Sequence, residues 1–435
     1  MKTVAFYTLG CKVNQYETEA MAELFQKNGY TVVNAEDKAD VYVINTCTVT
    51  NLGDRKSRQF IRRAKRINRE AVVAVVGCYV QVSPDEVFKI EDVDLVIGTS
   101  DKNKIVKLCE EVKEKNKRMK IVEDIMKVRE FEEMSIDEVK GKTRAFIKIQ
   151  EGCNQYCSYC IIPYARGPVR SRNLGNIIKE VEKLSRRGFK EIVLTGIHVA
   201  SYGKDLGDMR LIDVIEAIHD INGIERIRLS SLEPTIITED FMNRLSKLPK
   251  VCDHFHLSLQ SGSNTVLKRM NRKYTTEEYL SIVKLIRKYM PDVGLTTDII
   301  VGFPGETDEE FEETYNFVKE VGFSRIHVFK YSPREGTPAA KFKNQVDGTV
   351  KTERSRKLIE LGEKLNKTFN ERFVGKIMDV LFEEEVKGQP GLMEGYTTNY
   401  IRVEAKGDIS IEGKILPVKM NRISGENLIG EIVNK

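Results

Sequence analysis

Three cysteines lie close together in the stretch EGCNQYCSYC, at Cys153, Cys157 and Cys160. They follow the apolar run at residues 145–149, which predicts a strand that ends just before the first thiol. Three thiolates on one loop can hold an iron–sulfur cluster, whose usual complement is four ligands. An iron without a protein ligand can bind a substrate or cofactor directly, so this stretch is a candidate catalytic site.

Three further cysteines each follow a predicted strand in the first part of the chain. The runs that precede Cys11, Cys47 and Cys78 are residues 3–9, 41–45 and 71–76. Open parallel sheets place their ligands at the carboxyl ends of their strands. We therefore predict that these three thiols form a second cluster site, although buried core thiols are the plain alternative.

The composition indicates a soluble, cytoplasmic protein of two or three domains. The chain has 435 residues, of which 41% are hydrophobic. Eight cysteines are too few for a secreted disulfide scaffold, and their spacing favours metal binding in a reducing compartment. The sequence shows neither a signal peptide nor a membrane span, so no membrane partner is expected. The net charge of +5 is too small to indicate nucleic-acid binding.

From residue 142 onward, a pattern of strand and helix repeats about six times. The predicted strands are residues 145–149, 191–194, 226–230, 254–259, 295–301 and 326–330. Six repeats are too few to close an eight-stranded barrel, so they predict an open, partial (β/α)6 barrel. Its carboxyl mouth would bring the three motif cysteines together with the residues that follow the other strands.

The predicted mouth offers the groups that S-adenosylmethionine needs. The amino and carboxylate groups of that cofactor can chelate an open iron, while its ribose and adenine need polar partners and a flat apolar surface. Tyr159 is the candidate aromatic surface, and Gly196 would allow close approach of the backbone. Ser230 and Gln260 are the candidate polar contacts. Ser, Gly and Gln are common at strand ends, so each residue alone is weak evidence. The prediction depends on all four lying at the same end of the barrel.

A basic helix is predicted at residues 55–69, with eight Lys or Arg and no acid. At helical spacing, one ridge consists of Arg55, Arg58, Arg62, Arg66 and Arg69. We interpret this basic ridge as a contact for RNA phosphates rather than as a solvated face. Arg166, Arg170 and Arg172 are expected to add to it beside the mouth.

A long helix predicted at residues 349–373 leads into a last module, residues 372–435. Its short strand-like runs and frequent glycines predict a small β-barrel, a fold that commonly binds looped nucleic acid. The module has nine basic and ten acidic residues, so a structural cap is an equal alternative. Exposure of Tyr396, Tyr400 and Arg402 on one face would favour RNA.

The sequence assigns no chemical role to the remaining cysteines and histidines. Cys109 lies at core spacing with Ile105, Leu108 and Val112, and both Cys109 and Cys252 are interpreted as packed thiols. His198 follows a predicted strand end, and His254 and His256 alternate along a strand. Their roles stay open.

Taken together, the motifs resemble one enzyme family. The spacing of Cys153, Cys157 and Cys160 is the signature of radical S-adenosylmethionine enzymes. The segments TLGCKVNQYE, CNQYCSYCIIPYARGPVRSR, LSLQSGSNTVLKRMNRKYT and TDIIVGFPGETDEEF resemble its methylthiotransferase branch. The last module resembles the TRAM RNA-binding domain. The first segment and IIPYARGPVRSR look most like the threonylcarbamoyladenosine tRNA methylthiotransferases.

The resemblance implies an α/β protein of three domains. Residues 1–116 would form a Rossmann or flavodoxin-like parallel sheet with an auxiliary cluster. Residues 139–371 would form the radical SAM core, a partial TIM-like barrel, and residues 372–435 the TRAM-like β-barrel. The implied ligands of the radical-generating 4Fe-4S cluster are Cys153, Cys157 and Cys160. The implied ligands of the auxiliary 4Fe-4S cluster are Cys11, Cys47 and Cys78.

The resemblance also implies a reaction and its partners. One S-adenosylmethionine would donate methyl to a sulfur at the auxiliary cluster. A second would be cleaved to a 5′-deoxyadenosyl radical, which removes hydrogen from carbon 2 of the modified adenosine beside the anticodon. A radical suits an aromatic C–H, which has no acidic proton and no leaving group. The implied partners are the tRNA anticodon stem-loop, a flavodoxin- or ferredoxin-like electron donor, and a sulfur source.

Two other kinds of function stay open. A methylthiotransferase could act instead on isopentenyladenosine in tRNA or on an aspartate of a ribosomal protein. From a different class, the chain could be a non-catalytic RNA-binding protein whose cysteines hold structural zinc. Zinc sites normally have four ligands, and the loop at residues 151–160 contains no histidine.

Overall fold

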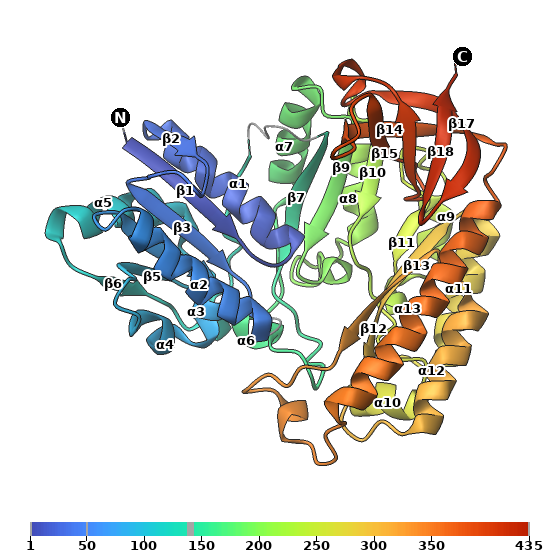
Figure 1. The fold of residues 1–435 in the computed structure, drawn as a ribbon, viewed down its shortest axis with the longest axis horizontal. Coiled ribbons are helices and arrows are strands. Elements are labelled where there is room, and N and C mark those ends of the chain that lie inside the picture. The colour runs from blue at the N-terminus through green and yellow to red at the C-terminus, as the bar shows by residue number, and fades with distance from the viewer. Residues whose placement is uncertain (1, 49–50, 137–142, 434–435) are drawn as a thin grey trace.

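The structure is a computed structural model that describes residues 2–48, 51–136 and 143–433. Along the chain it contains a parallel sheet, a partial barrel and a small closed β-barrel (Figure 1). The fold class expected from the sequence is therefore confirmed. The domain boundary predicted at residue 139 lies outside the described residues. Within the described ranges, no helix is both long enough and apolar enough to cross a membrane.

The first sheet has six parallel strands with helices on both faces. In spatial order the strands are β2 (Tyr30–Val33), β1 (Lys2–Thr8), β3 (Val41–Thr46), β4 (Val72–Gly77), β5 (Leu95–Ile97) and β6 (Met119–Ile121). The helices are α1 (Lys12–Lys27), α2 (Asn51–Ile67), α3 (Cys78–Val82), α4 (Pro84–Phe88) and α5 (Ile105–Lys115). Every residue of β3 and β4 is buried, because both faces of a parallel sheet are covered. The three strands that precede Cys11, Cys47 and Cys78 are neighbours in this sheet.

The partial barrel has six parallel strands, as the repeats predict. They are β7 (Arg144–Glu151), β9 (Glu191–Gly196), β10 (Arg226–Leu229), β11 (His254–His256), β12 (Gly294–Val301) and β13 (Arg325–Lys330). Bridges at Ile227–Val251 and Leu232–Leu257 join the two halves between β10 and β11. A two-residue strand, β8 (Arg170–Ser171), runs antiparallel to β7.

Helices cover the outside of the partial barrel (Figure 1). They are α7 (Leu174–Arg186), α8 (Leu211–His219), α9 (Glu239–Leu245), α10 (Asn264–Arg269), α11 (Thr276–Tyr289) and α12 (Asp308–Val321). Capping boxes start α11 and α12, where Thr275 and Thr307 accept hydrogen bonds from the backbone N–H groups of Glu278 and Glu310. Both helices pack their apolar stripe on the strands, which fixes the barrel wall.

A closed five-stranded barrel follows the long helix α13 (Gly348–Glu371). Its strands are β14 (Ile377–Glu385), β15 (Leu392–Tyr396), β16 (Arg402–Lys406), β17 (Ile415–Ser424) and β18 (Asn427–Ile432). It docks on the amino end of the partial barrel through two arginines of β10. Arg226 donates to the carbonyl oxygens of Tyr396 and Asp379, both at 2.8 Å. Arg228 donates to the carbonyl oxygens of Thr398 at 3.0 Å and Thr397 at 3.1 Å.

Tyr396 and Tyr400 face this docked surface and do not form an exposed RNA-stacking pair. The Tyr400 ring stacks on His254 with centroids 4.6 Å apart, and on Tyr396 at 4.9 Å. The guanidinium of Arg228 lies 4.7 Å from the centroid of the Tyr400 ring. These two tyrosines are therefore not exposed on one face, as RNA binding would require. They instead help to cap the partial barrel.

Candidate functional site

The loop that carries Cys153, Cys157 and Cys160 leaves the end of β7 through a constrained turn. Gly152 has φ +74°, and a Cβ there would lie 1.9 Å from the carbonyl oxygen of Pro168, so only glycine fits. The Cys153 N–H donates to the carbonyl oxygen of Gly167 at 3.0 Å. The Ser158 hydroxyl donates to the carbonyl oxygen of Arg269 at 2.7 Å. These bonds fix the loop at the carboxyl end of the barrel.

The three thiols of this loop are close enough to interact electrostatically. The pKa of Cys153 is raised to about 11 and that of Cys160 to about 12, chiefly by burial and in part by the neighbouring thiols. Arg272 donates from Nη1 to the Cys157 sulfur at 3.3 Å and from Nη2 to Glu233 at 2.8 Å. A guanidinium favours the thiolate that a metal requires, and iron would replace the thiol protons.

The second set of cysteines meets at the carboxyl edge of the first sheet. Gly10 has φ +104°, and a Cβ there would lie 2.7 Å from the Cβ of Cys47, so the Cys11 loop packs directly on Cys47. Cys78 is the first residue of α3, after β4. Burial raises the pKa of Cys78 to about 12, while Arg166 lowers it and the Cys11 and Cys47 thiols raise it. The structure thus brings together three thiols that are distant in sequence.

The donor atoms of both sets suit an iron–sulfur cluster, whose protein ligands are cysteine thiolates. In the part of the chain that the structure describes, no group of three His, Cys, Asp or Glu side chains is close enough to hold one metal ion. Three thiols with an arginine beside them match the charge of such a cluster.

A buried charge network joins the two sets of cysteines through Arg166, at the end of α6 (Ile162–Arg166). Arg166 donates from Nε to the Cys78 sulfur at 3.1 Å. Its Nη1 contacts Glu17 at 2.6 Å and Glu151 at 3.1 Å, and Glu151 lies two residues before Cys153. All of these side chains are buried. One guanidinium therefore connects the strand end at Glu151 with the sulfur of Cys78.

Two lysines complete this network around Glu17. Lys102 and Lys148 each place Nζ 3.1 Å from the Glu17 carboxylate, and Lys148 also lies 2.9 Å from Glu151. Burial alone would raise the pKa of Glu17, but Arg166 and the two lysines hold it well below the usual range. Glu17 therefore stays ionised, and it is the carboxylate that all three cations share.

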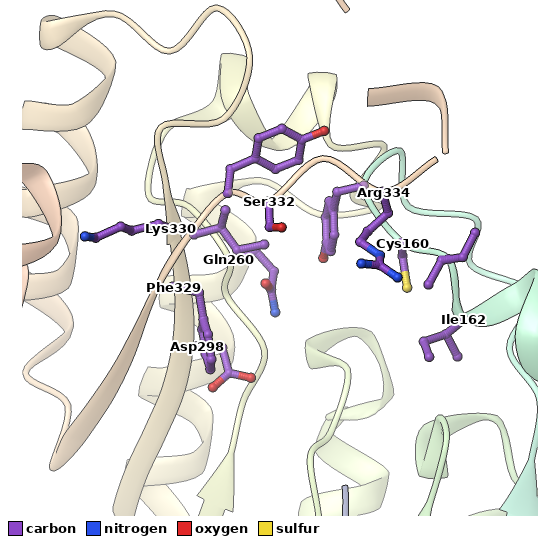
Figure 2. A pocket seen from close by; sticks show the side chains of 12 residues that line it. Cys160, Ile162, Gln260, Asp298, Phe329, Lys330, Ser332 and Arg334 are labelled. Carbon is purple, nitrogen blue, oxygen red and sulfur yellow. The ribbon is translucent and has the colours of Figure 1, made fainter. Parts of the chain in front are cut away.

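A cavity of about 220 Å³ opens beside Cys160 at the barrel mouth. Its lining includes Tyr159 and Gln260, two of the four residues predicted to contact the cofactor. Figure 2 shows Gln260 and Asp298 on one side of the cavity and Cys160 with Arg334 on the other, while Lys330 points away. Aromatic rings beside amide, carboxylate and guanidinium groups suit a nucleoside with a charged tail.

The other two predicted cofactor contacts do not line this cavity. Gly196 packs against Gln150, where a Cβ would lie 3.0 Å from the Gln150 backbone oxygen. Ser230 is buried, and within the described residues its hydroxyl has no hydrogen-bond partner. Their roles as cofactor contacts remain predictions.

The expectation that Arg166, Arg170 and Arg172 contact RNA is wrong, because all three are buried and engaged within the protein. Arg170 donates to the carbonyl oxygen of Arg166 at 3.0 Å. Arg172 pairs with Glu180 and with Glu133. Sequence alone does not distinguish a buried arginine from a surface one, because the carboxylates that neutralise it come from other segments.

The basic ridge on α2 is only partly free for RNA. Arg58 contacts Tyr79 at 2.8 Å and Glu86 at 3.2 Å. Arg55, Arg62, Arg66 and Arg69 are exposed, and among the described residues none of them forms an ion pair. Four of the five ridge arginines therefore remain available to phosphates.

Sequence reasoning missed several groups at the site. Arg272 and Glu233 lie behind Cys157. His198, whose role the sequence leaves open, lies next to them with Nε2 3.6 Å from Glu233. Asp298 and Arg334 line the cavity. The alternation along β12 could have revealed Asp298, because every second residue of a barrel strand points inward. No comparable pattern marks Arg272.

Comparisons with known proteins agree with this geometry. Residues 147–318 match the radical SAM superfamily, and residues 3–98 match the family described as uncharacterized protein family UPF0004. The chain is 48% identical to the threonylcarbamoyladenosine tRNA methylthiotransferase MtaB of Bacillus subtilis, over 97% of this chain and 94% of that protein.

More distant similarities extend over the same fold. The chain is 38% identical to a tRNA-2-methylthio-N(6)-dimethylallyladenosine synthase of Clostridium botulinum, over 98% of this chain and 95% of the relative. Among solved structures, the radical S-adenosylmethionine methyltransferase TsrM of Kitasatospora setae superposes with a TM-score of 0.60 at 15% identity. The match covers 78% of this chain and 77% of the other. At this identity the superposition supports the fold alone.

Proposed function

The chain belongs to the radical S-adenosylmethionine methylthiotransferases, and from this premise we propose that it adds a methylthio group to carbon 2 of threonylcarbamoyladenosine beside the anticodon of tRNA. Identity of 48% to a relative named for that substrate, against 38% to one named for the dimethylallyl substrate, supports the choice of nucleoside. The observation that carries the reaction class is the pair of three-cysteine sets connected by Arg166.

In this proposal Cys153, Cys157 and Cys160 hold one 4Fe-4S cluster, and Cys11, Cys47 and Cys78 hold a second. When bound, these clusters and S-adenosylmethionine supply the one-electron chemistry and the sulfur that an aromatic C–H requires. Arg272 and Arg166 stabilise the thiolates, each from a position held by buried carboxylates. Tyr159, Gln260, Asp298 and Arg334 bind and orient the cofactor.

The proposal includes domains at residues 1–116, 139–371 and 372–435. It also includes cytoplasmic tRNA as substrate, a flavodoxin- or ferredoxin-like electron donor and a separate sulfur source. A low-potential donor is required because reductive cleavage of a sulfonium consumes an electron. These parts rest on the family and on the chemistry of the reaction.

The nucleoside profile of tRNA from cells with and without the gene tests the function. We expect methylthiolated threonylcarbamoyladenosine to disappear from the deletion strain and to return with the wild-type gene. A gene carrying Cys47→Ala should fail to restore it, since the second cluster would lose a ligand. Loss of the methylthiolated isopentenyl nucleoside instead would identify the other tRNA substrate. An unchanged profile would contradict both.

The basic ridge yields a prediction about RNA affinity. Arg62→Glu combined with Arg66→Glu should weaken tRNA binding and reduce the slope of log Kd against log salt by about one to two. The reason is that both side chains are exposed and unpaired among the described residues. Titration of labelled tRNA at several salt concentrations measures this. The control, Lys364→Glu with Lys367→Glu on α13, makes the same charge change at another exposed position. Equal slopes for the two variants would contradict the ridge as an RNA contact.

A further inference from the structure

Lys12 is the first residue of α1 and directly follows Cys11. Lys12 is exposed, and its ammonium lies over a side chain of the first strand of the partial barrel. The ammonium nitrogen lies 5.8 Å from the centroid of the Phe146 ring on β7. It also lies within electrostatic reach of Tyr400, Arg144 and Arg228. The same is true of His254 and of the carboxylate of Glu191. Lys12 therefore enters the lumen from the side of the second cysteine set.

The other cations at this end of the lumen already have carboxylate partners. Arg144 places Nε 2.6 Å from Glu383, and Arg228 places Nε 2.7 Å from Glu191. Within the described ranges, the Lys12 ammonium has no hydrogen bond and no ion pair. An accessible cation surrounded by neutralised cations makes the lumen complementary to one additional anion.

The proposed substrate carries such an anion. In threonylcarbamoyladenosine, the amino group of threonine is acylated while its α-carboxylate remains free. The carbon to be methylthiolated and the carbon that bears the threonylcarbamoyl group lie on the same ring of the purine. A substrate whose carbon 2 faces the thiols of Cys11, Cys47 and Cys78 can therefore extend its carboxylate toward the neighbouring Lys12.

We propose that Lys12 is a specificity-determining residue that binds the threonyl carboxylate of the substrate inside the barrel lumen. This inference rests on the proposed function and extends it to substrate choice. An isopentenyl group has no charge, so the same ammonium would be left desolvated and unpaired against that substrate. Lys12 thus both attracts one nucleoside and disfavours the other.

The test compares two anticodon stem-loop RNAs, one with threonylcarbamoyladenosine and one with unmodified adenosine. Fluorescence anisotropy gives the dissociation constant of each RNA for the cluster-loaded wild-type protein and its variants. The wild type should prefer the modified RNA by roughly tenfold to hundredfold. Lys12→Gln should abolish this preference, and Lys12→Arg should retain most of it. Lys27→Gln, at the other end of α1, is the matched control and should keep the preference.

Iron content and product formation separate the possible failures. All variants should bind the same amount of iron as the wild type, because Lys12 is not a cluster ligand. Lys12→Gln should raise KM for the modified stem-loop more than it lowers kcat. If Lys12→Gln keeps the preference while the wild type modifies the RNA, this inference alone is overturned. If the wild type does not methylthiolate the modified stem-loop, the proposed function is overturned and the inference with it.

Discussion

Replacing Cys157 by alanine is expected to abolish methylthiolation and to remove about half of the bound iron, from about eight to about four atoms per chain. Cys157 is buried, and Arg272 donates to its sulfur at 3.3 Å. Two remaining thiolates cannot replace the third, because the loop that carries them is fixed by Gly152 and by backbone hydrogen bonds. Iron analysis and a tRNA methylthiolation assay after anaerobic reconstitution measure both effects.

Cys252→Ala is the matched control for this experiment. Cys252 is also buried, and burial raises the pKa of its thiol to about 12, but it belongs to neither set of three. This variant should keep about eight irons and full activity. Retention of activity by Cys157→Ala would contradict the assignment of the first cluster.

The second large effect concerns folding. Glu17→Gln is expected to lower the free energy of unfolding by about 3–5 kcal/mol, because it leaves buried cations without their shared partner. Lys148 and Arg166 would then keep Glu151 as their carboxylate partner, whereas the ion pair of Lys102 is with Glu17 and would be lost. Denaturation by urea, followed by tyrosine fluorescence and circular dichroism, measures the change.

A compensating substitution distinguishes charge from shape. Adding Lys102→Met to Glu17→Gln removes one of the unpaired cations and should recover part of the lost stability. The surface variant Glu111→Gln breaks an exposed pair with Lys115 and should leave the transition unchanged. A Glu17→Gln protein that unfolds like the wild type would show that the network contributes nothing to stability.

The long elements of this fold could be read from the sequence. The strands at residues 41–46 and 72–77 are continuous apolar runs, and both are fully buried. The strands that were missed are short or atypical. β5 and β6 have three residues each, and β15 contains Gly395, which packs against the backbone of β14 where a Cβ would lie 2.2 Å from Leu381 O. Their pairing depends on neighbours that are distant in sequence.

The sequence likewise predicts one part of the candidate site, the cysteines, and not the other, the arginines. The cysteines could be found because each follows a recognisable strand, and strand order brings them to a common edge. The arginines beside them could not be assigned, because a guanidinium in the sequence gives no sign of its partner. Arg166 illustrates this, since its acceptors come from α1, α3 and β7. Its role follows from tertiary contacts, which composition and spacing do not contain.

The docking of the last barrel also sets the order in which the protein can be completed. Arg226 donates to the carbonyl oxygen of Tyr396, 170 positions later in the chain. Because the ribosome makes the chain from its amino end, that acceptor emerges only when synthesis is nearly finished. The amino end of the partial barrel therefore stays uncovered throughout translation. If the clusters are assembled on the nascent chain, they form while the amino end of the partial barrel is still open. If they are assembled after release, they form after the C-terminal barrel has covered that end.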